Sequence, residues 1–314
     1  MNSFSEHYEL HRSIDDVAET FLKSSASKHC KFCNKAYPDV SFDNVPHIIP
    51  ELFGRNKWTS NFECDLCNEK FQKFEVHTAT MTQHYLSILQ IKTKNGIPTF
   101  QSFKKPYEFS TVIKTIEGNL SFNFGANLGD FQFNEENNSV SFFLKTKRFR
   151  PFFVYKTFLK IGLSLLTREE LETNDHYHHF LESEVPIENG MQFWKTFRYI
   201  LKTKYYSVPK ANLYQAKNTI DGKTVYPEYI LILYFANVVF QFFLPISKKN
   251  IIEHSNDNNL VIEMFPSFAL DDIASLSSTE IHNLGLNETK PSSMTENMTF
   301  YYDRLYKDVN VAEE

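Results

Sequence analysis

The chain has 314 residues, a formal net charge of −5 and a hydrophobic content of 42% that includes 31 Phe. A chain of this length and apolarity holds one large or two ordinary domains with a well-filled core, which argues against extensive disorder. The charge balance argues against a large nonspecific nucleic-acid footprint, since that requires clustered Lys and Arg.

The amino-terminal residues predict a short helix that leads into the most informative part of the chain. The segment Ser13–Asp16 has the pattern of a capping box, and Val17, Phe21 and Leu22 follow at helical spacing. The first residues show neither a basic nor an apolar targeting segment, so a signal peptide is not expected.

All four cysteines lie between residues 30 and 67, as the pairs Cys30/Cys33 and Cys64/Cys67. Two CxxC pairs supply the tetrahedral sulfur shell that Zn²⁺ prefers, and a shell with no open position is structural. The zinc would add folding free energy that a small module lacks. The alternative is a redox pair, but two CxxC pairs so far apart are not typical of redox sites. Cysteines used in this way fit a reducing compartment, and we expect a cytoplasmic protein.

Two polar residues stand out within this stretch. His47 lies in the short extended run 45–50, with proline on both sides, and Asn68 follows the second cysteine pair, where a helix would start. On composition alone, two other roles explain His47 as well as a functional one does. It could pack in the fold, or it could be a zinc ligand that replaces one cysteine.

The order of these residues resembles HNH endonucleases with the ββα-metal fold, in the branch whose two CxxC knuckles hold structural zinc. The resemblance implies that His47 is the general base that deprotonates water for attack on phosphorus. It also implies that Asn68 helps to hold a catalytic Mg²⁺ or Mn²⁺, and that Asn61 orients the imidazole. Histidine exchanges a proton near neutral pH, a metal offsets charge on the phosphate, and an amide oxygen suits a hard cation.

The sequence departs from the family pattern at two positions. Pro46 stands where the family commonly has an Asp or Glu that ligates the catalytic metal, and Gln72 stands where many members have a histidine four residues after the helix residue. A carboxylate or amide from elsewhere would have to replace the missing acid, and the candidates are Asp43, Asn44, Glu51 and Glu63.

Two further residues follow on the same predicted helix. Glu75 falls on the face of Asn68, but about 10 Å along the axis, which gives it a supporting role beside the catalytic residues. His77 falls on the opposite face and is expected at the surface. Residues 78–90 continue as a helix, and the turn at 95–98 marks the predicted boundary between two domains, 1–94 and 95–314, with the module core at 28–77.

The second domain has patterns of both strands and helices. Short alternating runs predict hairpins, and apolar residues at helical spacing predict helices. The predicted hairpins are 109–124, 131–149 and 230–243, and the predicted helices are 154–166, 168–181 and 191–201. The polar tail past about residue 278 is predicted to be partly mobile or an interaction segment.

Three stretches of this domain carry alternative interpretations. The apolar run Tyr229–Ile246 has the minimum length for a membrane span, but its β-branched and aromatic content favours a buried hairpin. The basic run Lys145–Arg150 interleaves an aromatic residue, as nucleic-acid-binding strands do, although a solvated strand end is favoured. A metal cluster at His176, His178 and His179 is disfavoured against a polar helix end.

These observations predict an α+β protein, with an amino-terminal zinc-stapled HNH module followed by a larger mixed α+β domain. The leading hypothesis is a nuclease that cleaves DNA, with a role in restriction or anti-phage defence. The larger domain, residues 95–314, has no assigned role and would act as a sensor, in DNA binding or in oligomerisation. This domain, a homo-oligomer or a partner subunit would contribute to DNA binding, and no membrane association is expected. The alternative is a catalytically silent zinc-stapled nucleic-acid-binding or assembly module, for which Pro46 is the main reason.

Overall fold

The computed structural model describes residues 4–16, 28–105, 108–124, 131–174, 176–186, 195–201, 204–221, 224–245, 261–262 and 279–302. Residues 17–22 of the predicted first helix lie outside the described residues. The expected capping box before them is present, because Ser13 N donates a hydrogen bond to the Asp16 carboxylate and Asp16 N donates one to the Ser13 hydroxyl.

The chain folds into mixed helices and strands, which confirms the predicted α+β class. The described helices are α1 (Phe4–His7), η1 (Glu51–Phe53), α3 (Asp65–Ile88), α4 (Pro151–Leu165), α5 (Arg168–Thr173) and α6 (His176–Glu182). The strands are β1 (Tyr8–Ser13), β2 (Phe100–Lys105), β3 (Glu108–Ile116), β4 (Asn119–Phe124), β5 (Phe131–Asn134), β6 (Ser139–Lys145), β7 (Lys195–Leu201), β8 (Tyr206–Ala216), β9 (Ile220–Asp221), β10 (Thr224–Val225), β11 (Tyr229–Ala236), β12 (Val238–Phe243), β13 (Val261–Ile262), β14 (Thr279–Gly285) and β15 (Thr295–Tyr301).

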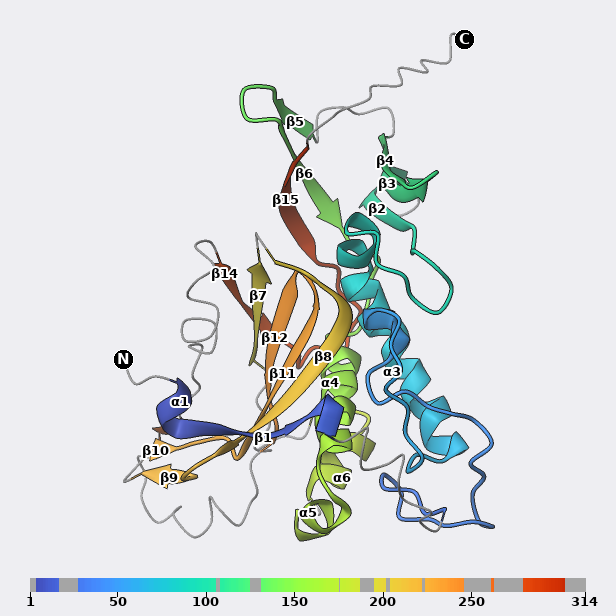
Figure 1. Ribbon diagram of the computed structural model, residues 1–314, viewed down its shortest axis with the longest axis vertical. Coiled ribbons are helices and arrows are strands. Elements are labelled where there is room, and N and C mark those ends of the chain that lie inside the picture. The colour runs from blue at the N-terminus through green and yellow to red at the C-terminus, as the bar shows by residue number, and fades with distance from the viewer. Residues whose placement is uncertain are drawn as a thin grey trace.

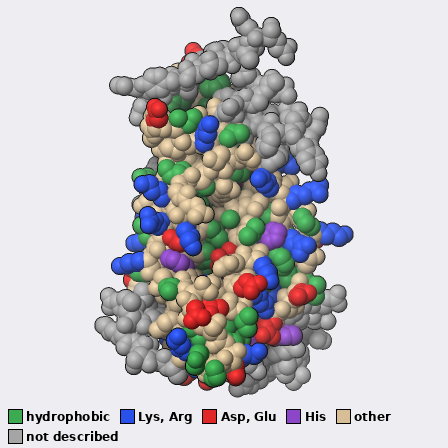
Figure 2. Space-filling view, turned by 90° about the vertical axis from the view of Figure 1, so that its right-hand side faces the viewer, with side chains coloured by type: hydrophobic (Ala, Val, Ile, Leu, Met, Phe, Trp, Pro, Cys, Tyr) green, Lys and Arg blue, Asp and Glu red, His purple; other side chains and the backbone are tan. Residues whose placement is uncertain are grey.

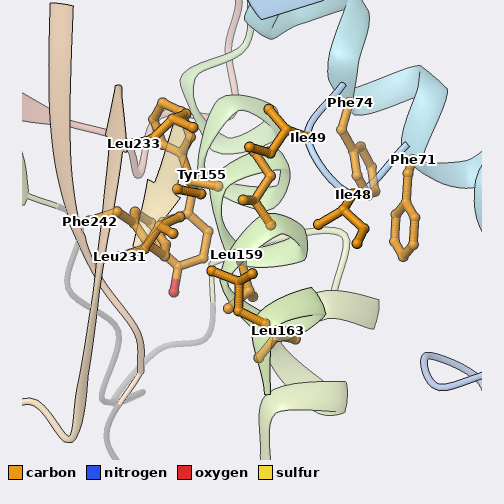
Figure 3. Packing of buried hydrophobic residues seen from close by; sticks show 14 of the residues in the cluster. Ile48, Ile49, Phe71, Phe74, Tyr155, Leu159, Leu163, Leu231, Leu233 and Phe242 are labelled. Carbon is orange, nitrogen blue, oxygen red and sulfur yellow. The ribbon is translucent and has the colours of Figure 1, made fainter. Parts of the chain in front are cut away.

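Helix α4 is the centre of the molecule, between the amino-terminal module and the largest sheet (Figure 1). Every residue of α4 except Phe153 is buried, which is the pattern of a helix covered on all sides. On one side Tyr155 packs against Phe242 of β12, with ring centroids 5.1 Å apart. On the other side Thr78 of α3 donates a hydrogen bond to Thr157 at 2.8 Å. Figure 3 shows the same arrangement, with α4 side chains between the sheet and the module.

The largest sheet has six antiparallel strands in the order β1-β8-β11-β12-β7-β14. Alternate residues of β11 point to opposite sides, and both sides are buried: Leu231 and Leu233 belong to the α4 core, whereas Ile230 and Ile232 belong to a second cluster. A strand buried on both faces reads as a continuous apolar run. The membrane-like composition of this stretch therefore comes from a hairpin covered on both faces.

The hairpin prediction for residues 230–243 is confirmed. The turn lies at Ala236, whose φ of 48° places it in the left-handed region, and the two strands pair from Ile230 with Phe243 to Phe235 with Val238. No helix among the described residues is long and apolar enough to cross a membrane.

Two glycines allow close packing around α4 and the module. A Cβ at Gly162 of α4 would lie 2.9 Å from the Leu244 side chain, so the helix approaches the end of β12 more closely than alanine permits. Gly54 ends η1 with a φ of 126°, and a Cβ there would lie 3.3 Å from both Pro209 and the Ser207 carbonyl of β8. The loop after η1 is therefore held against the large sheet.

Two smaller antiparallel sheets, β2-β3-β4 and β5-β6-β15, enclose a third apolar cluster with the end of α3. The buried carboxylate of Glu296 on β15 binds this helix and the large sheet together. It accepts hydrogen bonds from the Tyr85 hydroxyl at 2.7 Å and from Arg198, and it lies 3.0 Å from the His84 imidazole. Burial and the Arg198 charge lower the pKa of His84 to about 3, which keeps this histidine neutral.

Two predictions about the second domain need correction. Residues 195–201 form β7 instead of a helix, because Phe197, Tyr199 and Leu201 alternate on one buried face between β12 and β14. The predicted helix 168–181 is broken at Asn174 into α5 and α6. In the tail past residue 278, residues 279–285 and 295–301 pair as strands of two sheets, and the expected mobility or interaction role stays a prediction.

The other hairpins agree with the sequence analysis. Strands β3 and β4 pair around a turn at Glu117 and Gly118, both with positive φ, and β5 pairs with β6. The predicted helix 154–166 corresponds to α4. The division at residues 94/95 stays a prediction, but the main apolar core continues across it, from Ile14 to Leu286.

Candidate active site and zinc site

The four cysteines converge on one point at the start of α3. All four sulfur atoms lie within 4.8 Å of one another, and the Sγ atoms of Cys30 and Cys67, like those of Cys33 and Cys64, are 3.7 Å apart. A disulfide would need about 2.05 Å. A tetrahedral zinc site with Zn–S bonds of about 2.3 Å has sulfur–sulfur edges of about 3.8 Å, so the sulfur positions fit a structural zinc.

The first knuckle is bound to the second domain through its backbone and through Lys31. Lys31 Nζ donates to the carbonyl oxygens of Ser164, at 3.0 Å, and Leu166, which are free acceptors at the end of α4. The carbonyl of Phe32 lies 3.0 Å from His178 Nδ1 on α6. His178 is therefore a docking residue, and among the described residues the cysteines are the one group of three or more metal-ligating side chains close enough to share an ion.

His47 lies in a short antiparallel pairing that precedes α3, as expected for a ββα arrangement. Its partner is Thr59, and the flanking hydrogen bonds run from Ile48 N to Trp58 O at 2.7 Å and from Ser60 N to Pro46 O at 2.8 Å. Ile48 and Ile49, which follow His47 directly, are fully buried, and this fixes the segment on the core. The half-buried imidazole is therefore held on a rigid backbone.

The imidazole has a side-chain partner in Asn56, whereas the role predicted for Asn61 stays a prediction. Asn56 Oδ1 lies 3.2 Å from His47 Nδ1 and accepts a hydrogen bond from Trp58 N at 3.0 Å. Asn56 Nδ2 donates to two carbonyl oxygens, those of Ile49 and Gly54, each at 3.0 Å. Asn61 is exposed. Its position close to the second knuckle favoured it in the sequence, whereas Asn56 lies in the loop after η1, where its spacing gave no signal.

These contacts determine the tautomer of His47. Two carbonyl acceptors require the amide NH₂ of Asn56 to face them, so Oδ1 faces the imidazole and can only accept. Nδ1 of His47 therefore carries the proton, and Nε2 presents a lone pair. The Oε2 atom of Glu51 lies 3.5 Å from this Nε2.

One cleft, with a volume of about 770 Å³, brings most of the predicted site residues together. His47 and Glu51 line one wall, and α3 forms another. Asn68, Gln72 and Glu75 face the cleft from successive turns of α3, so the predicted helical face is as expected. The loop 93–98 completes the rim.

Of the four candidates for the missing acid, Glu51 has its carboxylate beside His47 in the cleft. Asp65 at the start of α3 accepts hydrogen bonds from the backbone of Asp43 and from both nitrogen atoms of Asn44, so the loop that carries these two residues is bound to the helix start. Glu63 is fully buried, and burial raises its pKa to about 7 against the opposing charge of Lys160.

Glu75 lines the same cleft as His47 and Asn68. Burial raises the pKa of its carboxyl group, and the charges of Lys160 and His47 oppose that shift. The carboxyl group therefore lies close enough to His47 and Lys160 for their charges to influence it. His77, by contrast, is only partly exposed and its Nδ1 accepts a hydrogen bond from Arg150 N, at the start of α4.

The basic run 145–150 is a solvated strand end apart from the buried Thr146 and Phe149.

Comparison with known families agrees with this geometry. Residues 30–84 match the model of a family described as HNH endonuclease, which covers both knuckles, His47 and most of α3. No curated protein and no solved structure matches the chain. The amino-terminal part of the protein is therefore an HNH module with a four-cysteine cluster whose geometry fits a metal ion, followed by a larger β-rich part.

Proposed function

We propose that the protein is a metal-dependent endonuclease that hydrolyses phosphodiester bonds in DNA, with His47 as the general base. The observation that carries the proposal is the shared cleft: a histidine with a fixed tautomer faces Asn68 of α3 and two carboxylates. A nuclease of this family needs these side-chain types around one phosphate-sized opening.

The base in this proposal is Nε2 of His47. Asn56 holds the proton on Nδ1, so Nε2 can take a proton from a water molecule that attacks phosphorus. The carboxylate of Glu51 lies 3.5 Å from Nε2, and after proton transfer it stabilises the imidazolium. Base and stabilising anion therefore lie side by side on the same wall of the cleft.

We assign the catalytic divalent ion to Glu51 and Asn68, with Glu75 close enough to support them. Carboxylate and amide oxygens suit Mg²⁺ or Mn²⁺, and Mg²⁺ keeps several waters, so a site with few protein ligands fits it. When bound, the ion supplies positive charge that offsets the charge on the scissile phosphate and the leaving oxygen. Glu51 in this assignment replaces the acid that the family has at the position of Pro46.

Cations at one rim of the cleft support a nucleic-acid substrate. Lys94 lines the cleft, Lys92 lies two residues earlier, and Arg55 N binds the Lys92 carbonyl at 2.7 Å, so three exposed cations gather on two adjacent segments. Figure 2, which views the molecule from the α3 side, shows Lys and Arg side chains along both margins of its middle part. Such cations bind phosphates without reading sequence.

Several finer expectations rest on the family resemblance, on the cysteine usage and on the charge balance of the sequence. These are a role in restriction or anti-phage defence, a cytoplasmic location, and a homo-oligomer or partner subunit that assists DNA binding. The alternative function, a catalytically silent zinc-stapled binding module, is favoured by one feature, the replacement of the usual acid by Pro46.

The test is nicking of supercoiled plasmid in Mg²⁺ or Mn²⁺ by the wild type and by His47→Ala. Removal of a general base lowers the rate about 10²–10⁴-fold. His179→Ala is the matched control, because His179 is exposed on α6 and does not line the cleft. Equal cleavage by wild type and His47→Ala would remove His47 from the mechanism, and a wild type that binds DNA without cleaving it in either metal would favour the silent module.

A further inference from the structure

A lysine from outside the HNH segment reaches the backbone of the catalytic histidine. Lys160 belongs to α4, far beyond residues 30–84, yet its Nζ donates a hydrogen bond to the carbonyl oxygen of His47 at 2.6 Å. The side chain is 2% exposed. We propose that Lys160 is a positioning residue for His47, so that α4 completes the active site; this inference rests on the proposed function of His47.

The local pairing explains why His47 needs this bond. Backbone hydrogen bonds flank His47 and Thr59 on both sides but do not join them, so they form a non-hydrogen-bonded antiparallel pair. In such a pair the N–H and C=O groups of both residues point away from the opposite strand. The His47 carbonyl is therefore directed at α4, and Lys160 supplies its donor.

The same ammonium group is anchored by Glu63. Lys160 Nζ lies 3.2 Å from Glu63 Oε2, and the Glu63 side chain is completely buried. Glu63 directly precedes Cys64, the first cysteine of the second knuckle. Lys160 therefore joins the backbone of the catalytic residue to the zinc site through one buried charge, and the low dielectric around the pair strengthens the attraction.

Lys160 also acts on the floor of the cleft. Burial raises the pKa of the Glu75 carboxyl group, and the positive charge of Lys160 lowers it, more strongly than the charge of His47 does. The ammonium group thus contacts His47 and Glu63 and acts on Glu75 through its charge. A lysine that served packing alone would not need polar contacts to both His47 and Glu63.

A second buried lysine on α4 shows the difference. Lys156, one turn earlier, donates to the carbonyl oxygens of Phe180, Leu181 and Ser183 and so binds the end of α6. It is buried on the same helix and makes the same kind of bond, but its acceptors lie away from His47. Lys156→Met is therefore a matched control for the removal of Lys160.

The experiment compares Lys160→Met/Glu63→Gln with Lys156→Met and with Glu63→Gln alone. The double variant leaves no unpaired buried charge, so it avoids the unfolding expected of Lys160→Met by itself. The first measurement is the imidazole ¹⁵N spectrum of histidine-labelled full-length protein, in which the His47 signal is assigned by its loss in His47→Ala. The second is the rate of plasmid cleavage at saturating substrate.

We expect the double variant to displace the His47 signal and to lower kcat at least tenfold with little change in KM, whereas Lys156→Met stays near the wild type. Glu63→Gln keeps the hydrogen bond from Lys160 to the His47 carbonyl, so it should move the signal less than the double variant does. A His47 signal that is unmoved in the folded double variant would overturn the proposal, whatever the activity. If Glu63→Gln alone moves the signal as far as the double variant does, the lysine is not the positioning group. If the wild type does not cleave DNA but the signal is displaced, the proposed function fails and the positioning role stands.

Discussion

Replacement of Asn56 by alanine tests the assignment of the imidazole partner. The Asn56 side chain makes four contacts between 3.0 and 3.2 Å, with His47 Nδ1, Trp58 N and the carbonyls of Ile49 and Gly54. A net hydrogen bond contributes about 0.5–1.5 kcal/mol, and water can reach part of this loop. We therefore expect Asn56→Ala to lower the free energy of unfolding by about 2–4 kcal/mol.

The effect on cleavage should exceed the effect on stability. Without Asn56 the imidazole is able to rotate and to carry its proton on either nitrogen, so the fraction with an unprotonated Nε2 facing the cleft falls. We expect a loss of activity that approaches the range of about 10²–10⁴-fold for removal of a general base. Urea unfolding monitored by tryptophan fluorescence measures stability, and plasmid nicking without urea, well below the unfolding temperature, measures activity separately.

Asn61→Ala is the informative comparison, because Asn61 is the residue that the sequence favoured. It is exposed and the Nδ1 hydrogen bond belongs to Asn56, so we expect a smaller loss of both stability and activity. The reasoning is refuted if Asn61→Ala abolishes cleavage while folded Asn56→Ala retains it. In that case the imidazole would have a different partner in the active protein.

Three other predictions follow from the site and its surroundings. Removal of zinc by a chelator, or Cys30→Ser, should lower the melting temperature and expose the α3–α4 interface to protease. Substitution of the zinc by Co²⁺ should give a thiolate absorption band. An unchanged melting temperature after complete metal removal would exclude a structural role for the metal. Burial raises the pKa of Glu63 from 4.5 to about 7, so the folded state binds this proton more tightly than the unfolded state does. The free energy of unfolding should therefore fall as pH rises from about 4.5 to about 7 and level off above that. In urea titrations, Glu63→Gln should flatten this dependence of the unfolding free energy on pH. Substitution of Arg55, Lys92 and Lys94 by alanine should weaken DNA binding. The slope of the logarithm of the binding constant against the logarithm of salt concentration should become smaller by about 0.9 for each phosphate that the protein no longer neutralises. An unchanged slope would mean that DNA binds at another surface.

The sequence predicted those features that depend on local chemistry. Two CxxC pairs specify a sulfur site whatever surrounds them, and the helix face shared by Asn68 and Glu75 follows from the period of α3. The hairpin of β11 and β12 was also predictable, because its length and β-branched content fit strands.

The features that the sequence did not predict depend on contacts between distant segments. Residues 195–201 have a pattern compatible with a helix, and the choice of strand comes from pairing on both sides with β12 and β14. Likewise β14 and β15 are rich in polar residues, and the strands that pair with them lie far away in the chain. Tertiary pairing overrides weak local preference in both cases.

The role of α4 was hidden for a related reason. Its sequence is apolar on nearly every side, so periodicity indicates a buried helix but gives no indication of its neighbours. Lys156 and Lys160 interrupt that pattern without an obvious local reason. In the structure each of them satisfies carbonyl groups of another segment, Lys156 at the end of α6 and Lys160 at His47. Lys31 of the first knuckle does the same in the opposite direction, at the end of α4.

This arrangement bears on how the two parts of the protein relate. The HNH module lies on α4, α4 lies on the large sheet, and one apolar core contains residues of all three (Figure 3). Phe158 of α4, for example, is packed against Phe53 of η1 on one side and against Phe240 of β12 on the other. Because interiors are close-packed, a displacement of the sheet cannot leave α4 unmoved, and the ammonium group of Lys160 moves with it. A displacement of the sheet would therefore reach His47 through its backbone carbonyl, with no need for the two parts to separate.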